Sequence, residues 1–274
     1  MNLCFVLTFF LLNITEKGDS KIMENARIVE NVVLPSKGLI YEEDVSPEIE
    51  LSSMKTKHEM LRLSATEESQ KVMAEIIDDC IVGDLGISSY DLCLGDFQYL
   101  LYKLRVVTFG PDYEMTAKCP FCGYENSVKV NLDELPVNEF DESLADLLEF
   151  TLPVSGNKIK LTMQTPRMLD RINSKMRQYN KRRKNTNENT VVLFTIMSSI
   201  EEIDDEAPDT LHLEDWVREL PMADTNTILK RIDEINGKLG IELDTLEVCG
   251  VCGSNYIAPF RINNTFFRPD ITIA

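Results

Sequence analysis

The sequence predicts an α+β fold in which a small β core is divided along the chain. Two Cys-x-x-Cys-Gly motifs, at residues 119–123 and 249–253, are separated by residues 124–248. The residues that follow the first motif alternate polar and apolar as in a half-buried strand, and those after the second also look extended. Stretches with apolar residues at helical spacing lie before the first motif and between the two. The chain therefore combines an N-terminal helical region, a split β core and an inserted helical bundle.

The two motifs carry most of the chemical information. Each spacing lets a tight turn direct two thiolates at one tetrahedral Zn²⁺, and the glycine lets the backbone bend under the second sulfur without a Cβ clash. Together they supply four ligands, Cys119, Cys122, Cys249 and Cys252. Four protein ligands form the closed coordination sphere of a structural zinc site. We therefore predict a zinc-ribbon-like β core held by Zn²⁺.

Two other interpretations of the cysteines remain open. Cys119-Pro120-Phe121-Cys122 is also the Cys-Pro-x-Cys pattern that opens the active helix of glutaredoxin-like proteins, where a helix N-terminus lowers the thiol pKa. Residues 126–132 and 256–262 favour strands after both motifs, which suits a ribbon better. A ribbon that has kept its cysteines without the metal is the other alternative.

Composition limits the possible functions. The formal net charge of −18 disfavours broad attraction to nucleic acid or anionic lipid. The 43% hydrophobic content is ample for a packed core. Four of the seven cysteines are committed to the motifs, which suits a reducing compartment better than a disulfide framework.

The first 22 residues form an apolar N-terminal extension. Its apolar run is too short to span a bilayer as a helix, and no Lys or Arg precedes it as in a signal peptide. We interpret Met23 as the natural start and residues 1–22 as an upstream extension, with an export signal as the alternative. We predict no membrane span.

Residues 23–55 are predicted to be an extended arm with a Pro/Gly turn, which covers either a neighbour or its own core. Residues 56–118 form the helical region. Two apolar faces at helical spacing define it: Val72, Met73, Ile76, Ile77, Cys80 and Ile81, then Phe97, Leu100, Leu101 and Leu104.

The split β domain is expected at residues 119–164 plus 245–274, and it includes a hairpin around Ser155-Gly156-Asn157. Residues 165–244 form the helical insertion. It begins with an N-cap and an N1 proline at Thr165-Pro166. Further helices are expected near residues 191–200, 215–220 and 227–236.

Charge within this insertion is strongly polarised. Residues 165–184 hold eight basic residues against one acid, Asp170, and residues 201–206 reverse the sign. One interpretation is a solvated basic helix end that an acidic loop partly neutralises. The other is a docking surface for an acidic partner or nucleic acid, with Arg182 and Arg183 as candidate contacts. Only Tyr179 interleaves the basic residues, which disfavours base stacking and favours the solvated helix end over a docking surface.

Motifs for catalysis are missing from the sequence. It has no phosphate-binding loop, no dinucleotide fingerprint, no His-Glu-x-x-His and no nucleophile elbow. The two histidines, His58 and His212, are expected at the surface. We therefore predict that the chain is not an enzyme.

Three segments, taken in order, resemble a known family. They are Leu34-Pro35-Ser36-Lys37-Gly38, the approach Leu104-Arg105…Phe109-Gly110…Tyr113 to the first motif, and Phe266-Phe267-Arg268-Pro269 after the second. With the cysteines, they resemble the baseplate hub protein family of T-even-type contractile-tailed bacteriophages, over roughly residues 23–270. The resemblance implies a structural subunit or assembly factor of the tail baseplate hub, made in the host cytoplasm.

The expected partners are other phage tail or baseplate proteins, in a hetero-oligomer. Candidate contacts are the extended arm and Phe266, Phe267 and Arg268, although the two rings could equally be core residues. The competing hypothesis is a zinc-ribbon nucleic-acid adaptor related to transcription. It predicts salt-sensitive binding through residues 167–184.

Overall fold

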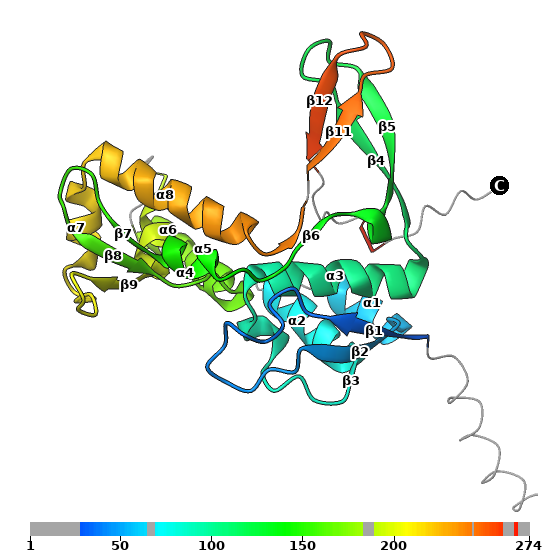
Figure 1. Cartoon of the computed structure of the whole chain (residues 1–274), viewed down its shortest axis with the longest axis horizontal. Helices are drawn as coiled ribbons and strands as arrows, with labels where there is room; N and C mark the ends of the chain where they lie inside the picture. Colours follow the sequence, from blue (N-terminus) through cyan, green and yellow to red (C-terminus); the bar gives the residue numbers. More distant parts are fainter. Residues whose placement is uncertain (1–27, 65–68, 183–188, 243, 260–265, 268–274) are drawn as a thin grey trace, which may run out of the picture.

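The computed structural model describes residues 28–64, 69–182, 189–242, 244–259 and 266–267. In this part of the chain, eight α-helices combine with five small antiparallel sheets of two or three strands. The predicted mixture of helices and small sheets is therefore confirmed. Figure 1 shows two lobes side by side, and a pair of β-hairpins that projects from the first lobe.

The first lobe packs a three-stranded sheet against helices. Its elements are β1 (Val29–Val33), β2 (Glu48–Ser52), β3 (Ile81–Val82), α1 (Thr56–Ser64), α2 (Ser69–Cys80), the 3-10 helix η1 (Ser89–Asp91) and α3 (Leu94–Phe109). The apolar faces predicted for residues 72–81 and 97–104 contribute Ile76, Ile77, Leu100 and Leu104, all fully buried. Their burial, with that of the other apolar side chains of this core, is the main favourable contribution to folding of the lobe.

The N-terminal segment covers its own core. Leu34 and Leu51 are fully buried, and the described part of the predicted arm pairs with β3 through β2. The turn of this segment at residues 35–40 is held by Asp96, which lies in the first turn of α3. Asp96 Oδ1 accepts from the Ser36 N–H at 3.0 Å, and Oδ2 accepts from the Tyr41 hydroxyl at 2.7 Å. Burial raises the pKa of Asp96. Of the two possibilities for the arm, the structure shows the intramolecular one.

The second lobe is built from α4 (Ser143–Leu148), β7 (Glu149–Thr151), β8 (Lys158–Leu161), α5 (Pro166–Arg182), α6 (Val191–Ser199), β9 (Ile200–Ile203), α7 (Leu213–Glu219) and α8 (Met222–Gly237). The predicted hairpin is present, with β7 paired to β8. Asp224, buried in the first turn of α8, holds its turn by accepting the N–H groups of Val154 and Ser155, each at 2.9 Å. These backbone hydrogen bonds keep the pKa of Asp224 below its usual value despite burial, which acts in the opposite direction.

Two residues of the acidic segment pair with a lysine of the neighbouring strand. Residues 200–203 form strand β9, because Ile200 and Ile203 pack on the apolar core of this lobe beside β8. Glu201 and Glu202 pair with Lys160 at 2.9 and 3.2 Å. These two acids are thus satisfied within the sheet.

The expectation of a surface position for His58 was wrong. The side chain is buried where α1 packs on α2, and its Nε2 lies 2.6 Å from Asp79 Oδ2. Its Nδ1 accepts from the Lys55 N–H at 3.0 Å. Lys57 and His58 lower the pKa of Asp79. This histidine is satisfied by structural contacts, whereas His212 is exposed as predicted.

The lobes meet around β6 (Val137–Asn138), which pairs with β10 (Gly240–Ile241). A Cβ on Gly240 would lie 2.8 Å from the Gly95 Cα, so glycine at both positions lets β10 touch the start of α3.

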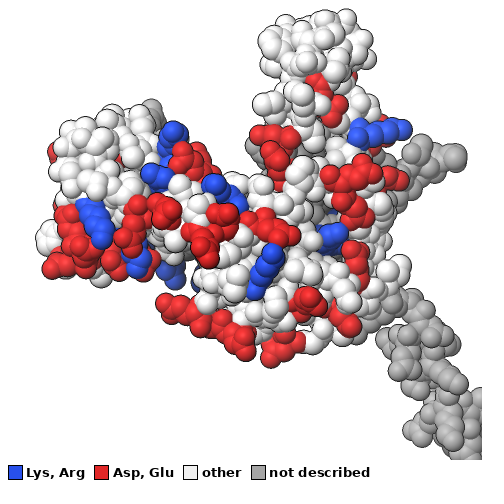
Figure 2. Space-filling model, in the orientation of Figure 1, with Lys and Arg blue, Asp and Glu red and all other residues white. Residues whose placement is uncertain are grey.

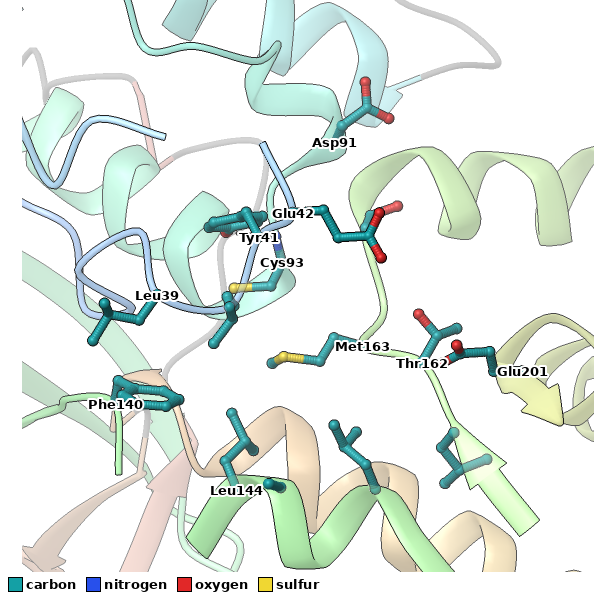
Figure 3. A pocket seen from close by; sticks show the side chains of 15 residues that line it. Leu39, Tyr41, Glu42, Asp91, Cys93, Phe140, Leu144, Thr162, Met163 and Glu201 are labelled. Atoms are coloured by element: carbon teal, nitrogen blue, oxygen red, sulfur yellow. Dashed lines mark hydrogen bonds between the residues drawn. The ribbon is translucent and has the colours of Figure 1, made fainter. Parts of the chain in front are cut away.

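A cleft of about 500 Å³ separates Leu39 and Phe140 from Met163 (Figure 3). Burial, with the nearby Asp96 carboxylate, raises the pKa of Cys93 in this cleft to about 12, so its thiol stays protonated at neutral pH.

Candidate metal centre

The two cysteine motifs sit at the tips of two β-hairpins. The first hairpin is β4 (Asp112–Lys118) with β5 (Glu125–Asn131), and the second is β11 (Asp244–Val248) with β12 (Asn255–Pro259). Both point away from α3 and lie side by side (Figure 1). Their buried faces pack together through Val128, Val130, Tyr256 and Ala258. Alternation along each strand therefore brings remote segments into one small core.

The two Cys-x-x-Cys-Gly turns at the hairpin tips, called knuckles below, have matching backbone geometry. In the first, the Gly123 N–H donates to the Cys119 carbonyl at 2.9 Å and the Cys119 N–H to the Tyr124 carbonyl at 2.8 Å. In the second, Gly253 and Cys249 make the equivalent bonds, both at 3.0 Å. Gly123 and Gly253 have φ of 76° and 69°, where an L side chain would be strained. Each turn thus requires the glycine seen in the sequence.

The structure brings the four predicted sulfur atoms together. All lie within 4.8 Å of one another, with Cys119 Sγ 3.8 Å from Cys252 Sγ and Cys122 Sγ 3.6 Å from Cys249 Sγ. A tetrahedron with Zn–S bonds of about 2.3 Å has S···S edges of about 3.8 Å, whereas a disulfide bond is about 2.05 Å. The spacing fits four thiolates around a tetrahedral metal ion.

The four cysteines differ in their exposure to solvent and in the pKa of their thiols. Cys119 and Cys249 are buried, whereas Cys122 and Cys252 are exposed. The N–H groups of Cys252 and Val251 lower the pKa of Cys249 to about 6, which favours the thiolate at neutral pH. A metal ligand must be deprotonated, so this lowered pKa favours metal binding, whereas the pKa of Cys122 is raised to about 12 and its proton must be displaced.

Asn126 joins the two knuckles, and it was not among the site residues predicted from the sequence. Its side chain is 8% exposed; Oδ1 accepts from the Gly250 N–H at 3.0 Å, and Nδ2 lies 3.8 Å from Cys249 Sγ. Partners of this kind orient metal ligands. The strand alternation could have identified it in the sequence. Asn126 lies two and four residues before Val128 and Val130, so this polar residue shares the buried face of β5 with them.

The other candidate residues lie elsewhere. Phe266 and Phe267 are 0% and 3% exposed, and the Phe266 ring packs edge-on against Tyr102 at 5.1 Å between centroids. They belong to the core of the described fold and present no contact surface. Arg182 is exposed at the end of α5, whereas Arg183 and Arg268 lie outside the described residues.

In the ranges that the structure describes, no helix has both the length and the apolar character needed to cross a bilayer. Comparisons with curated proteins and with solved structures gave no match. The profile of the T4 bacteriophage base plate protein family matches residues 27–268, which is most of the chain and includes all four cysteines. This match confirms the resemblance at the level of a baseplate protein. The chain belongs to the T4 bacteriophage base plate protein family.

Proposed function

We propose that the chain is a non-enzymatic structural subunit or assembly factor of the baseplate hub in a contractile phage tail. In this proposal a Cys4 Zn²⁺ site holds its two hairpins as a split zinc ribbon. The observation that carries the proposal is the convergence of four sulfur atoms from two remote hairpins in a member of a baseplate family.

The proposed zinc has a mechanical role. Four thiolates leave no coordination position for water, which is the arrangement of a structural site. Together with the hydrogen bond from the Gly250 N–H to Asn126, the metal would fix the mutual angle of the hairpins and their projection from α3. Such a site can contribute on the order of 10 kcal/mol to folding, far more than an exposed ion pair.

The second hairpin carries an exposed apolar face that suits contact with another baseplate protein. Leu246, Val248 and Ile257 are 73%, 63% and 61% exposed, and Leu246 lies directly opposite Ile257. The outward face of the first hairpin is polar by contrast, with Thr116 and Lys129. Contiguous exposed apolar side chains mark interaction surfaces. Assembly would take place in the host cytoplasm and lead to the tail baseplate.

Co-expression with the other tail proteins of the same phage tests this function. We expect a stable hetero-oligomer, lost in Leu246→Glu and retained in the matched control Thr116→Glu. Mass spectrometry of purified tails separates a subunit, present in the particle, from an assembly factor, absent from it. Normal baseplates in a phage that lacks the gene would contradict the proposal, and nuclease-sensitive association would support the nucleic-acid adaptor instead.

A further inference from the structure

Helix α5 presents a row of basic side chains. Arg167, Arg171, Lys175 and Arg182 are exposed and recur at spacings close to whole helical turns, so they lie on one side of a helix about 25 Å long. The sole acid of this helix, Asp170, is buried. The chain as a whole carries a net charge of −18, and acidic side chains predominate on the face shown in Figure 2. The row is therefore a local reversal of charge.

A cleft of about 400 Å³ lies beside this row, where α2 and η1 pack against α5. Lys71, Tyr90, Arg167, Asp170, Arg171 and Lys175 line it. Arg167 is held in place, because its Nη2 lies 2.7 Å from Asp91 Oδ2 and its guanidinium carbon 4.5 Å from the centre of the Tyr90 ring. One wall of the cleft is thus preorganised.

Asp170 leaves one acceptor without a donor. It is 4% exposed, and its Oδ2 accepts from the Lys71 N–H at 3.0 Å and from the Tyr90 hydroxyl at 3.1 Å. Its Oδ1 has no hydrogen-bond partner among the described residues. A buried oxygen of this kind is costly unless a donor reaches it, so it points to a ligand that brings an N–H or O–H group.

Two cations of the cleft have no carboxylate partner among the described residues. Across the described ranges, no carboxylate lies within ion-pair distance of Arg171 or Lys175. The acids of β9, which the sequence suggested as their counter-charges, pair with Lys160 instead. Two exposed cations therefore remain available beside the unfilled acceptor.

We propose that this cleft binds an acidic peptide segment of another protein. Carboxylates of the segment pair with Arg171 and Lys175, and one of its backbone N–H groups donates to Asp170 Oδ1. The phosphate groups of a nucleic acid, which would pair with Arg171 and Lys175, have no donor at neutral pH to offer Asp170, so a base would have to supply it. Tyr90, the aromatic ring of the cleft, is buried beneath Arg167 and is not free to stack on a base. Both points favour a peptide over nucleic acid.

This inference deepens the proposed function by giving the chemistry of one partner, but its test uses the isolated chain. Labelled poly-glutamate peptide is titrated against the full chain and the double variant Arg171→Gln/Lys175→Gln. We expect binding by the parent chain and about a tenfold or greater loss of affinity in the variant, since two charge-assisted contacts disappear. Both side chains are exposed, so thermal unfolding should be unchanged.

The matched control is Lys129→Gln/Lys230→Gln, which changes the net charge equally at exposed positions away from the cleft. It should retain peptide affinity. An equal loss in both double variants, or no peptide binding by the parent chain, overturns the proposal. Tighter binding of a poly-thymidine oligonucleotide than of the peptide also overturns it, in favour of a phosphate-binding surface. None of these outcomes bears on the zinc site or on membership of the baseplate.

Discussion

Replacing Asn126 by Ala tests whether the two knuckles act as one metal site. The amide bridges the hairpins by accepting from the Gly250 N–H at 3.0 Å and by placing its Nδ2 3.8 Å from Cys249 Sγ. Asn126→Ala removes both contacts and leaves all four cysteines in the chain. The variant therefore changes the orientation of the ligands without changing their number.

The expected loss of zinc affinity follows from typical magnitudes and from the exposure of Gly250. Loss of a partner in the outer shell of a metal site typically lowers metal affinity by about 10–100-fold. A donor left without its acceptor costs about 1–3 kcal/mol when it is buried. Gly250 is exposed, so water replaces part of the lost bond. We therefore expect the lower end, about a tenfold loss of zinc affinity.

Competition with a zinc chelator of known affinity measures this loss. Asn126→Asp sharpens the test, because the carboxylate still accepts from the Gly250 N–H but places negative charge beside the Cys249 thiolate. We expect it to weaken zinc binding more than Ala does. Ser127→Ala is the control, since this exposed neighbour on β5 faces away from the cysteines. Equal zinc affinity in the parent chain and both Asn126 variants would refute the bridging role.

Three further predictions concern the lobes. Asp224→Asn should lower the urea midpoint at pH 7. Because the folded pKa is depressed, the difference between the two proteins should be full above the unfolded value near 3.9, shrink as pH falls below it, and close only below the folded pKa. Gly95→Ala should destabilise strongly in thermal unfolding, since its Cβ would lie 2.5 Å from the Leu239 carbonyl oxygen, whereas Gly237→Ala meets nothing within 4 Å and should be tolerated. Phe266→Ala should cost about 3–5 kcal/mol in urea unfolding, as expected for a buried aromatic side chain, and a change below 1 kcal/mol would show that the ring is not part of the core.

Local patterns in the sequence were sufficient for several elements. The apolar spacing of residues 97–104 corresponds to the buried face of α3, and the Ser-Gly-Asn turn lies between β7 and β8. The two Cys-x-x-Cys-Gly motifs predicted the turns, because the glycine and the spacing fix the geometry of each turn by themselves. The convergence of the sulfurs was predicted from the four ligands that one structural zinc ion requires.

Features that depend on long-range packing were less accessible. Pairing of β9 with β8 decides that Glu202 lies opposite Lys160, and no short pattern encodes which strand lies beside which. His58 is buried because α1 folds onto α2, and Phe266 because its segment returns to α3. Asn126 was accessible in principle, since its parity along β5 places a polar side chain on the buried face.

Elemental analysis of the purified chain, with Cys119→Ser/Cys249→Ser as the comparison, tests the role of the four cysteines most directly. This pair of substitutions removes one buried ligand from each knuckle. We predict one zinc ion per chain in the parent protein and none in the double variant, together with a lower unfolding temperature. A zinc content that is the same in both proteins, or a fully folded parent chain that binds no zinc when supplied with it, would contradict the proposed metal site.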